Sequence, residues 1–381
     1  MESGKRCSDT LPPSMPPALR LRDRILSEGP IPFAPFMEEA LYGEEGYYSR
    51  DAVPIGEEGD YVTGSSLSPL FGRVTARLLS RLDRALGAPA ELFEAGYGTG
   101  AHLESVVSSP LCLSPFSKKE GGPRRVRAWD RVSRAVPAGV ERVADLADVG
   151  EVDGLIFSYE LFDALPVHRL IGRADGSVGE LWVDVEGDGF VWREGDVSDP
   201  ALPDLLGGAA LAPGQVADLA PGWGPLYREI AGRLGRGLVV TCDYGFERER
   251  LLDVRVRQHG TLACYSRQRV HRNPFVLVGE QDLTAHVDFT ALLRAGEEAG
   301  LMTLAFTRQA FWLTACGLFE ELEGADFETR RQAMALLDGE GMGEEIRVLV
   351  QGRGIDPGEV LGEGGVPLSR VGGGRWERGQ G

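Results

Sequence analysis

The sequence predicts an α/β fold with a mainly parallel sheet, and three observations support this. Short apolar runs at 90–95, 154–159 and 237–245 have the length and composition of strands that are buried on both faces. Segments with apolar residues at helical spacing separate them, and this alternation is typical of parallel sheets. A glycine-rich turn follows the first run directly. The 381 residues, 43% of them hydrophobic, suffice for one such domain enlarged by insertions, or for two domains.

The two ends of the chain differ from its middle in composition. Residues 1–17 are rich in Ser and Pro and lack an apolar period, so we expect a disordered tail. Residues 18–88 should form a helical segment packed on the core, because Ser68 and Pro69 are a typical N-cap and first residue of a helix. The apolar face of that helix consists of Leu70, Val74, Leu78, Leu82 and Leu86. Residues 362–381 are rich in Gly and should form a flexible tail.

Residues 89–355 contain the remaining strands of the predicted sheet. A second strand is expected at 126–130, and a weaker third at 141–145. Alternating apolar residues at 180–194 surround a Gly-Asp-Gly turn, which indicates a β-hairpin. Because this hairpin interrupts the strand–helix alternation, we assign it to an inserted cap at about 175–225.

The composition limits the classes of partner. A net charge of −18 would repel nucleic acid and anionic lipid, and it would attract a basic protein partner or simply keep the chain soluble. The five cysteines have no CxxC spacing, which argues against disulfides or a zinc site, and we predict no metal. No apolar run reaches 18 residues, so we expect a soluble, cytoplasmic protein without membrane insertion.

The glycine-rich turn predicts a Rossmann-like nucleotide loop. Glu94, Gly96, Gly98 and Gly100 match the form used by class I methyltransferases, in which the acid receives the amino acid portion of the cofactor. The same stretch fits G-x-G-x-x-A through Ala101, the form used for nicotinamide or flavin dinucleotides. The glycines allow close approach of the backbone, and the following helix presents free N–H groups to an adenosine-bearing ligand.

Asp130 ends the second strand, where a carboxylate can accept hydrogen bonds from ribose hydroxyls. It lies about 30 residues after the loop instead of the roughly 20 of the dinucleotide fingerprint, which disfavours NAD. A solvated turn acid is the alternative.

The acids Glu160 and Asp163 follow the strand at 154–159, at the edge of the sheet where ligands bind. Three positions apart on a first helical turn, both could hold a cationic acceptor, with Glu160 suited to a guanidinium. Alternatively they only complement the helix dipole. Asp282 and His286 could also reach the cleft, although a turn role fits them better, and Asp288 should cap the helix after it.

Several segments in this order resemble the MidA family, which includes mitochondrial complex I assembly methyltransferases. They are residues 31–48, 59–63, 68–72, the glycine loop, 160–168, 242–245, 260–262, 279–289 and 342–344. The resemblance covers roughly residues 20–355. It implies a class I fold with a seven-stranded sheet and an antiparallel final hairpin, S-adenosylmethionine as cofactor, and methylation of arginine in a protein, with a respiratory-complex subunit among the candidates.

The chain departs from this family at three places. Gly64, Ser65 and Ser66 stand where a carboxylate is usual before the Ser-Pro-Leu-Phe-Gly segment. Tyr97 and Thr99 replace a common Pro and Arg, and Tyr159 replaces Asn or His. We therefore keep two alternatives beside a methyltransferase: an assembly factor that binds the cofactor without catalysis, and an NAD(P)-dependent oxidoreductase.

Overall fold

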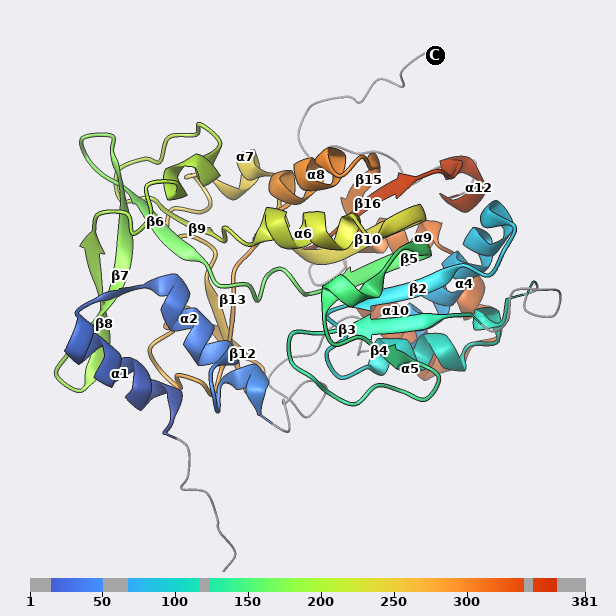
Figure 1. Ribbon diagram of the computed structural model, residues 1–381, viewed down its shortest axis with the longest axis horizontal. Helices are drawn as coiled ribbons and strands as arrows, with labels where there is room; N and C mark the ends of the chain where they lie inside the picture. Colours follow the sequence, from blue (N-terminus) through green and yellow to red (C-terminus); the bar gives the residue numbers. More distant parts are fainter. Residues whose placement is uncertain (1–14, 51–67, 115, 117–123, 339–344, 362–381) are drawn as a thin grey trace, which may run out of the picture.

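The structure is a computed structural model that describes residues 15–50, 68–114, 116, 124–338 and 345–361 (Figure 1). Several predicted features lie outside the described residues. They are most of the N-terminal tail, the C-terminal tail at 362–381, the family segments at 59–63 and 342–344, and the departures at Gly64, Ser65 and Ser66.

The main domain is built on an eight-stranded sheet. Its spatial order is β15 (Met302–Arg308), β16 (Ile346–Arg353), β10 (Leu234–Phe246), β5 (Val152–Tyr159), β2 (Glu91–Ala95), β3 (Val126–Trp129) and β4 (Glu141–Arg142), and β14 (Val287–Asp288) pairs with β10. The strands from β4 to β10 are parallel, whereas β16 runs antiparallel to both of its neighbours. The α/β class is thus confirmed. The sheet is mixed and has one strand more than the predicted seven, because the two-residue β14 is too short to leave a pattern in the sequence.

Helices cover both faces of this sheet (Figure 1). One face carries α4 (Pro69–Leu86), α5 (Ala101–Ser108), α9 (Gln309–Ala315), α10 (Phe327–Leu337) and α12 (Pro357–Leu361). The other carries α6 (Trp223–Ala231) and α8 (Phe289–Glu298). Side chains alternate between the faces, so Leu92 packs with the first group and Phe93 with the second. As predicted, Ser68 caps α4 by accepting a hydrogen bond from the N–H of Leu70.

A second, antiparallel sheet forms the cap. It consists of β1 (Ile31–Pro32), β7 (Val178–Glu186), β6 (His168–Gly172) and β9 (Val216–Leu219), with β8 (Gly189–Gly195) paired to β7. The predicted hairpin at 180–194 is present as β7 and β8. The cap sheet begins at β6, before residue 175, and it includes β1 because Ile31 pairs with Val183 across a large sequence separation.

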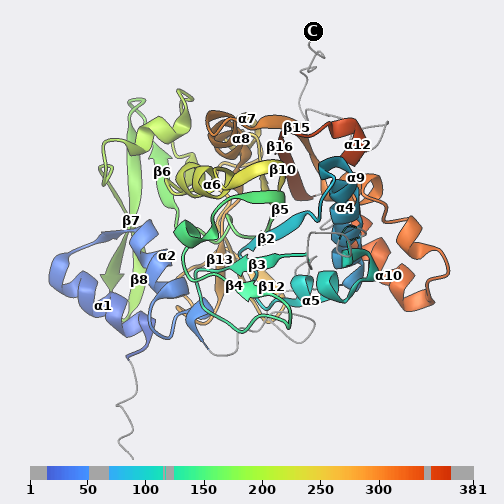
Figure 2. The same cartoon turned by 45° about the vertical axis from the view of Figure 1, so that its right-hand side comes forward.

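The N-terminal helices divide between the cap and the main domain. Helices α1 (Pro17–Glu28) and α2 (Phe33–Tyr42) pack on the cap strands β6 and β7, while α4 packs on the main sheet (Figure 2). The described helices of residues 18–88 therefore pack on two different sheets. The difference arises because the apolar faces of α1 and α2 meet the cap sheet, which periodicity within each helix does not reveal.

The remaining elements are short. A third sheet contains β11 (Ala263–Ser266), β12 (Arg269–His271) and β13 (Asp282–Thr284). The others are α7 (Arg248–Leu251) and the 3-10 helices η1 (Tyr47–Ser49), η2 (Pro110–Cys112), η4 (Leu146–Val149), η5 (Leu202–Leu206) and η6 (Glu320–Leu322). Within the described part of the chain, every helix is too short or too polar to span a bilayer.

The strand order reverses between β2 and β5. From β2 the chain continues to β3 and β4 on one side, and it then crosses to β5 and β10 on the other. In open α/β sheets a ligand crevice lies at such a reversal, beyond the carboxyl ends of the strands. At this edge Glu94 is the penultimate residue of β2, and Asp130 and Glu160 directly follow β3 and β5.

Candidate cofactor and acceptor site

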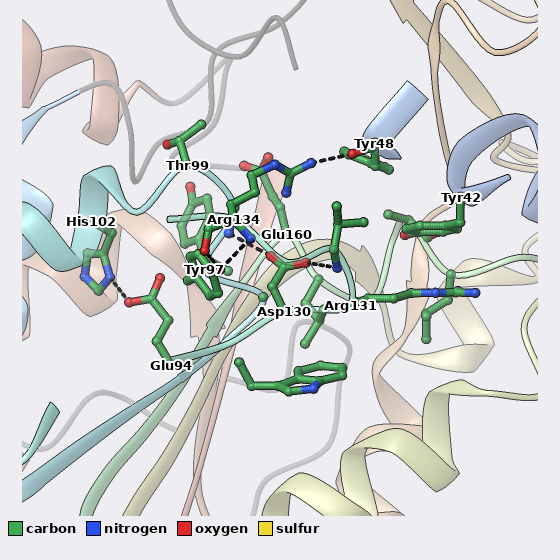
Figure 3. A pocket seen from close by; sticks show the side chains of 18 of the residues that line it. Tyr42, Tyr48, Glu94, Tyr97, Thr99, His102, Asp130, Arg131, Arg134 and Glu160 are labelled. Atoms are coloured by element: carbon green, nitrogen blue, oxygen red, sulfur yellow. Dashed lines mark hydrogen bonds and ion pairs between the residues drawn. The ribbon is translucent and has the colours of Figure 1, made fainter. Parts of the chain in front are cut away.

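A cavity of about 450 Å³ opens at the carboxyl ends of β2, β3 and β5 (Figure 3). Its size is within the range of small-molecule sites. All but one of the predicted cofactor residues line it, namely Glu94, Gly96, Gly98 and Asp130, and Glu160 lies on its wall. Gly100 lies beside it, at the N-cap of α5. The structure thus brings together residues from three separate strands.

The glycine loop has the conformation that only glycine adopts easily. The φ angles of Gly96, Gly98 and Gly100 are +77°, +55° and +79°. A methyl group added to Gly96 would come within 2.8 Å of Leu161, whereas one added to Gly98 would enter open space. The backbone of Gly98 can therefore approach a ligand closely, and an adenosyl group fits the cavity by size and by the donors of the loop.

Asp130 lies opposite this loop (Figure 3). Its carboxylate accepts hydrogen bonds of 2.9 Å from the N–H groups of Gly98 and Val132. Burial nevertheless raises the pKa of Asp130 above its ordinary value. Each oxygen keeps a lone pair beyond these bonds, so the carboxylate can still accept the two hydroxyls of a ribose. The position of Asp130 fits its predicted role as the acceptor of the ribose hydroxyls.

Glu94 is the penultimate residue of β2 and is only 3% exposed. Its Oε2 atom lies 2.7 Å from Nδ1 of His102, and Nε2 of His102 lies 3.0 Å from the hydroxyl of Thr75. His102 was not among the site residues predicted from the sequence. His102 lies on the first turn of the helix after the loop, eight residues beyond Glu94. This position is the signal from which its contact with Glu94 could have been predicted.

Two of the departures from the family have defined roles in the structure. The hydroxyl of Tyr97 donates a 2.6 Å hydrogen bond to the carbonyl of Arg134 and accepts one of 2.9 Å from its N–H, which ties the glycine loop to the segment after β3. The hydroxyl of Tyr159 donates a hydrogen bond of 2.7 Å to Gln309. Both tyrosines line the cavity and satisfy their polar atoms.

A second, smaller cavity of about 80 Å³ adjoins the first. Tyr48 and Glu160 line both cavities. The small cavity is further lined by Asp163, Tyr244, Tyr265, Asp282 and Thr284. It therefore combines three carboxyl groups with aromatic walls, which is a suitable lining for a cationic group.

Glu160 and Asp163 are not on a helical turn, contrary to the expectation from their spacing. Residues 160–166 form bends and turns, and Glu160 has a left-handed φ of +48°. Asp243 imposes this conformation: its Oδ2 accepts hydrogen bonds of 3.1 Å and 2.8 Å from the N–H groups of Leu161 and Phe162. A partner more than 80 residues away thus decides where the two acids point.

The carboxyl groups of this region influence one another. Burial, together with the negative charges of Asp243, Glu160 and Asp282, raises the pKa of Asp163 well above its ordinary value. Burial also raises the pKa of Asp243 to about 7, although the N–H groups of Phe162, Tyr244 and their neighbours oppose the shift. A cation in the small cavity would relieve this repulsion and favour the ionised carboxylates.

Asp282 and His286 have different positions. Asp282 is 2% exposed and lines the small cavity, where its Oδ1 accepts a 2.8 Å hydrogen bond from Tyr48. It therefore belongs to the cavity, whereas the sequence favoured a role in a turn. His286 packs against the rings of Tyr244 and Phe246, and burial lowers its pKa to about 4. Asp288 caps α8 as predicted, accepting a hydrogen bond from Thr290. In the described ranges, no three His, Cys, Asp or Glu side chains are arranged to hold a metal ion.

Comparison with known proteins agrees with this geometry. Residues 125–307 match the family described as "Putative S-adenosyl-L-methionine-dependent methyltransferase". The protein arginine methyltransferase NDUFAF7 homolog of Drosophila melanogaster is 27% identical over 323 residues, which are 74% of this chain and 70% of that protein. Human NDUFAF7, a mitochondrial protein arginine methyltransferase, is 25% identical over 75% of this chain and 70% of its own length.

A solved structure extends the comparison to the fold and the ligand. The Burkholderia thailandensis protein crystallised with S-adenosylhomocysteine has a TM-score of 0.79 and 28% identity, and the match covers 91% of this chain and 96% of that one. The native crystal structure of a COG1565 superfamily protein from the same organism matches with a TM-score of 0.77 and 28% identity, over 93% of this chain and 98% of that one. The resemblance to the MidA family is thereby confirmed: the chain is an S-adenosylmethionine-dependent methyltransferase related to the NDUFAF7 proteins, and S-adenosylmethionine is its cofactor.

Proposed function

We propose that this methyltransferase acts on an arginine side chain of a protein substrate. The observation that carries the proposal is the small acidic cavity, which shares Glu160 and Tyr48 with the cofactor cavity. A guanidinium is planar and presents several N–H groups, and it pairs well with more than one carboxylate. The names of the relatives as protein arginine methyltransferases support the same assignment.

The chain's own side chains would orient the acceptor. S-adenosylmethionine supplies a methyl group on a positively charged sulfur, and in-line displacement transfers it to a nucleophile. Glu160 lies on the wall between the two cavities, so it can hold one edge of a guanidinium while the nearest nitrogen faces the cofactor cavity. Asp163 and Asp282 would hold the opposite edge.

The acceptor nitrogen must lose a proton when it gains the methyl group. Glu160 is placed to accept this proton as the nitrogen–carbon bond forms and the carbon–sulfur bond breaks. Its negative charge also favours the lone pair on the nitrogen that it contacts. Asp243 acts indirectly, because its hydrogen bonds to Leu161 and Phe162 fix the turn that carries Glu160.

The substrate protein and the cell compartment stay predictions. The net charge of −18 suits a basic protein partner and disfavours nucleic acid. A respiratory-complex subunit is our candidate substrate, by resemblance to the assembly methyltransferases. Cytoplasmic location is our expectation for this chain, although several of the relatives are named as mitochondrial proteins.

Incubation with S-adenosylmethionine labelled in its methyl group and with cell extract tests the proposal. We expect label on a protein, and methylarginine in its digest by mass spectrometry. Glu160→Gln should lose most of the label, whereas the matched control Glu249→Gln, an exposed acid on α7, should not. Binding of S-adenosylhomocysteine without any label transfer would instead favour a non-catalytic assembly factor, and label on another residue type would contradict arginine as the acceptor.

A further inference from the structure

His102 lies behind Glu94, on the side away from Asp130 (Figure 3). Both side chains are nearly inaccessible, with 3% exposure for each residue. The 2.7 Å contact between Nδ1 and Oε2 occupies one oxygen of the carboxylate. Glu94 itself lines the cofactor cavity, and no described hydrogen bond engages its second oxygen.

The hydroxyl of Thr75 contacts the other nitrogen of the His102 ring. The hydroxyl of Thr75 has one proton, and its oxygen lies 3.1 Å from the carbonyl oxygen of Phe71, which can only accept. The same oxygen lies 3.0 Å from Nε2 of His102. The two ring nitrogens thus contact Thr75 on one side and Glu94 on the other.

Packing fixes the imidazole ring in this position. Its centroid lies 4.6 Å from the ring of Phe157 on β5, and 5.7 Å from that of Phe71 on α4, which it meets edge to face. His102 itself is the second residue of α5, directly after the glycine loop. The orientation of Glu94 is thus determined jointly by α4, α5 and β5, which the ligand does not need to rearrange.

We propose that His102 is a positioning residue for the cofactor, which holds Glu94 so that its second oxygen accepts the amino group of S-adenosylmethionine. A carboxylate at the wall of this cavity needs a cationic donor, and the amino acid portion of the cofactor carries one. Holding the acceptor rigidly removes the ordering cost that a free glutamate side chain would add on binding. The inference rests on the cofactor site alone, so it stands or falls independently of arginine as the acceptor.

Two ligands separate this role from a general effect on folding. S-adenosylhomocysteine contains the amino acid portion, and 5′-methylthioadenosine lacks it. In calorimetric titrations we expect His102→Phe, which keeps an aromatic ring and removes both ring nitrogens, to weaken the binding of S-adenosylhomocysteine about 10- to 100-fold. Its affinity for 5′-methylthioadenosine should change less than about twofold. His102→Asn retains an N–H group at the position of Nδ1 and should recover most of the loss.

The cap provides a matched control. Nδ1 of His168 lies 2.6 Å from the buried carboxylate of Glu180, away from both cavities, so His168→Phe breaks a similar pair without touching the cofactor. Its affinity for S-adenosylhomocysteine should equal that of the wild type. If His102→Phe does not fold, Thr75→Val is the second test, because it removes the partner of Nε2 and Thr75 lies outside the cavity. It should weaken the binding of S-adenosylhomocysteine without weakening that of 5′-methylthioadenosine. The proposal would be overturned if the variants lost affinity equally for both ligands, or lost affinity for neither.

Discussion

The hydroxyl of Tyr48 donates a 2.8 Å hydrogen bond to the buried Oδ1 of Asp282, and its backbone carbonyl accepts one of 2.6 Å from the guanidinium of Arg134. Tyr48 belongs to η1 beside the cap, Asp282 begins β13, and Arg134 follows β3. One residue thus contacts both the segment that bounds the cofactor cavity and the acid that lines the small cavity. The N-terminal segment that carries Tyr48 is thereby part of the site, although residues 18–88 were predicted only to pack on the core.

Tyr48→Phe should therefore weaken the binding of the protein substrate more than the binding of the cofactor. Removal of the hydroxyl leaves the buried Asp282 without one of its donors, which costs about 1–3 kcal/mol. We expect the KM for the protein substrate to rise about tenfold, while the Kd for S-adenosylhomocysteine stays close to that of the wild type. Tyr227→Phe is the control, because it removes a buried hydrogen bond to Gln351 in the core. A change confined to cofactor affinity would contradict this role.

Asp163→Asn should stabilise the protein and inactivate it. Because the pKa of Asp163 is raised on folding, the folded state keeps a proton that the unfolded chain releases, so stability is greatest at acid pH and falls as the pH rises. The variant cannot ionise at this position. We expect it to be about 1–2 kcal/mol more stable than the wild type near pH 8, with the difference shrinking toward pH 4.

Thermal unfolding over this pH range, without substrate, measures the effect of Asp163→Asn. Asp188→Asn, at the exposed turn of the cap hairpin, should show no such trend. An advantage of the Asp163 variant that is largest at acid pH would have the wrong sign and would refute the explanation. Methyl transfer should be lost at every pH, since the neutral amide cannot pair with a guanidinium as a carboxylate does.

Asp130→Ala should weaken the binding of the cofactor. The change removes the acceptor that we assign to the ribose and leaves the N–H of Gly98 without its 2.9 Å partner. Loss of a charge-assisted bond of about 1.5–3 kcal/mol corresponds to a Kd for S-adenosylhomocysteine that is about 10- to 150-fold higher. Asp145→Ala is the control, since Asp145 also accepts a backbone N–H, from Ala147, but is exposed outside the cavity. Equal affinities for the two variants would remove Asp130 from the site.

Gly98→Ala distinguishes backbone strain from obstruction of the cavity. Gly98 and Gly139 both have positive φ, of +55° and +85°, and a methyl group on either meets no atom within 4 Å. Each substitution should therefore cost about 1 kcal/mol of stability. Only Gly98 lines the cofactor cavity, so only Gly98→Ala should also reduce affinity for S-adenosylhomocysteine, by about tenfold or more. Titration of both variants would show whether the loop approaches the ligand as inferred.

The local sequence was sufficient for the elements and for the cofactor loop. Buried strands such as β2 and β5 leave continuous apolar runs, and the cap of α4 at Ser68 follows from the chemistry of adjacent residues. The same holds for the glycine loop, because a left-handed backbone needs glycine wherever it occurs. Its neighbour Asp130 could be found because strand ends meet at one edge of a parallel sheet.

Only the tertiary structure decided how distant residues combine into the acceptor site. The turn that carries Glu160 depends on Asp243, and Asp282 enters the cavity because Tyr48 and β13 bring it there. His102 likewise acquires its role through Glu94, Thr75 and the surrounding rings. The sequence by itself determined the fold class and the cofactor loop, since these depend on neighbours along the chain. The acceptor site depends on contacts between segments far apart in the sequence, and no local pattern records which carboxylates are buried together.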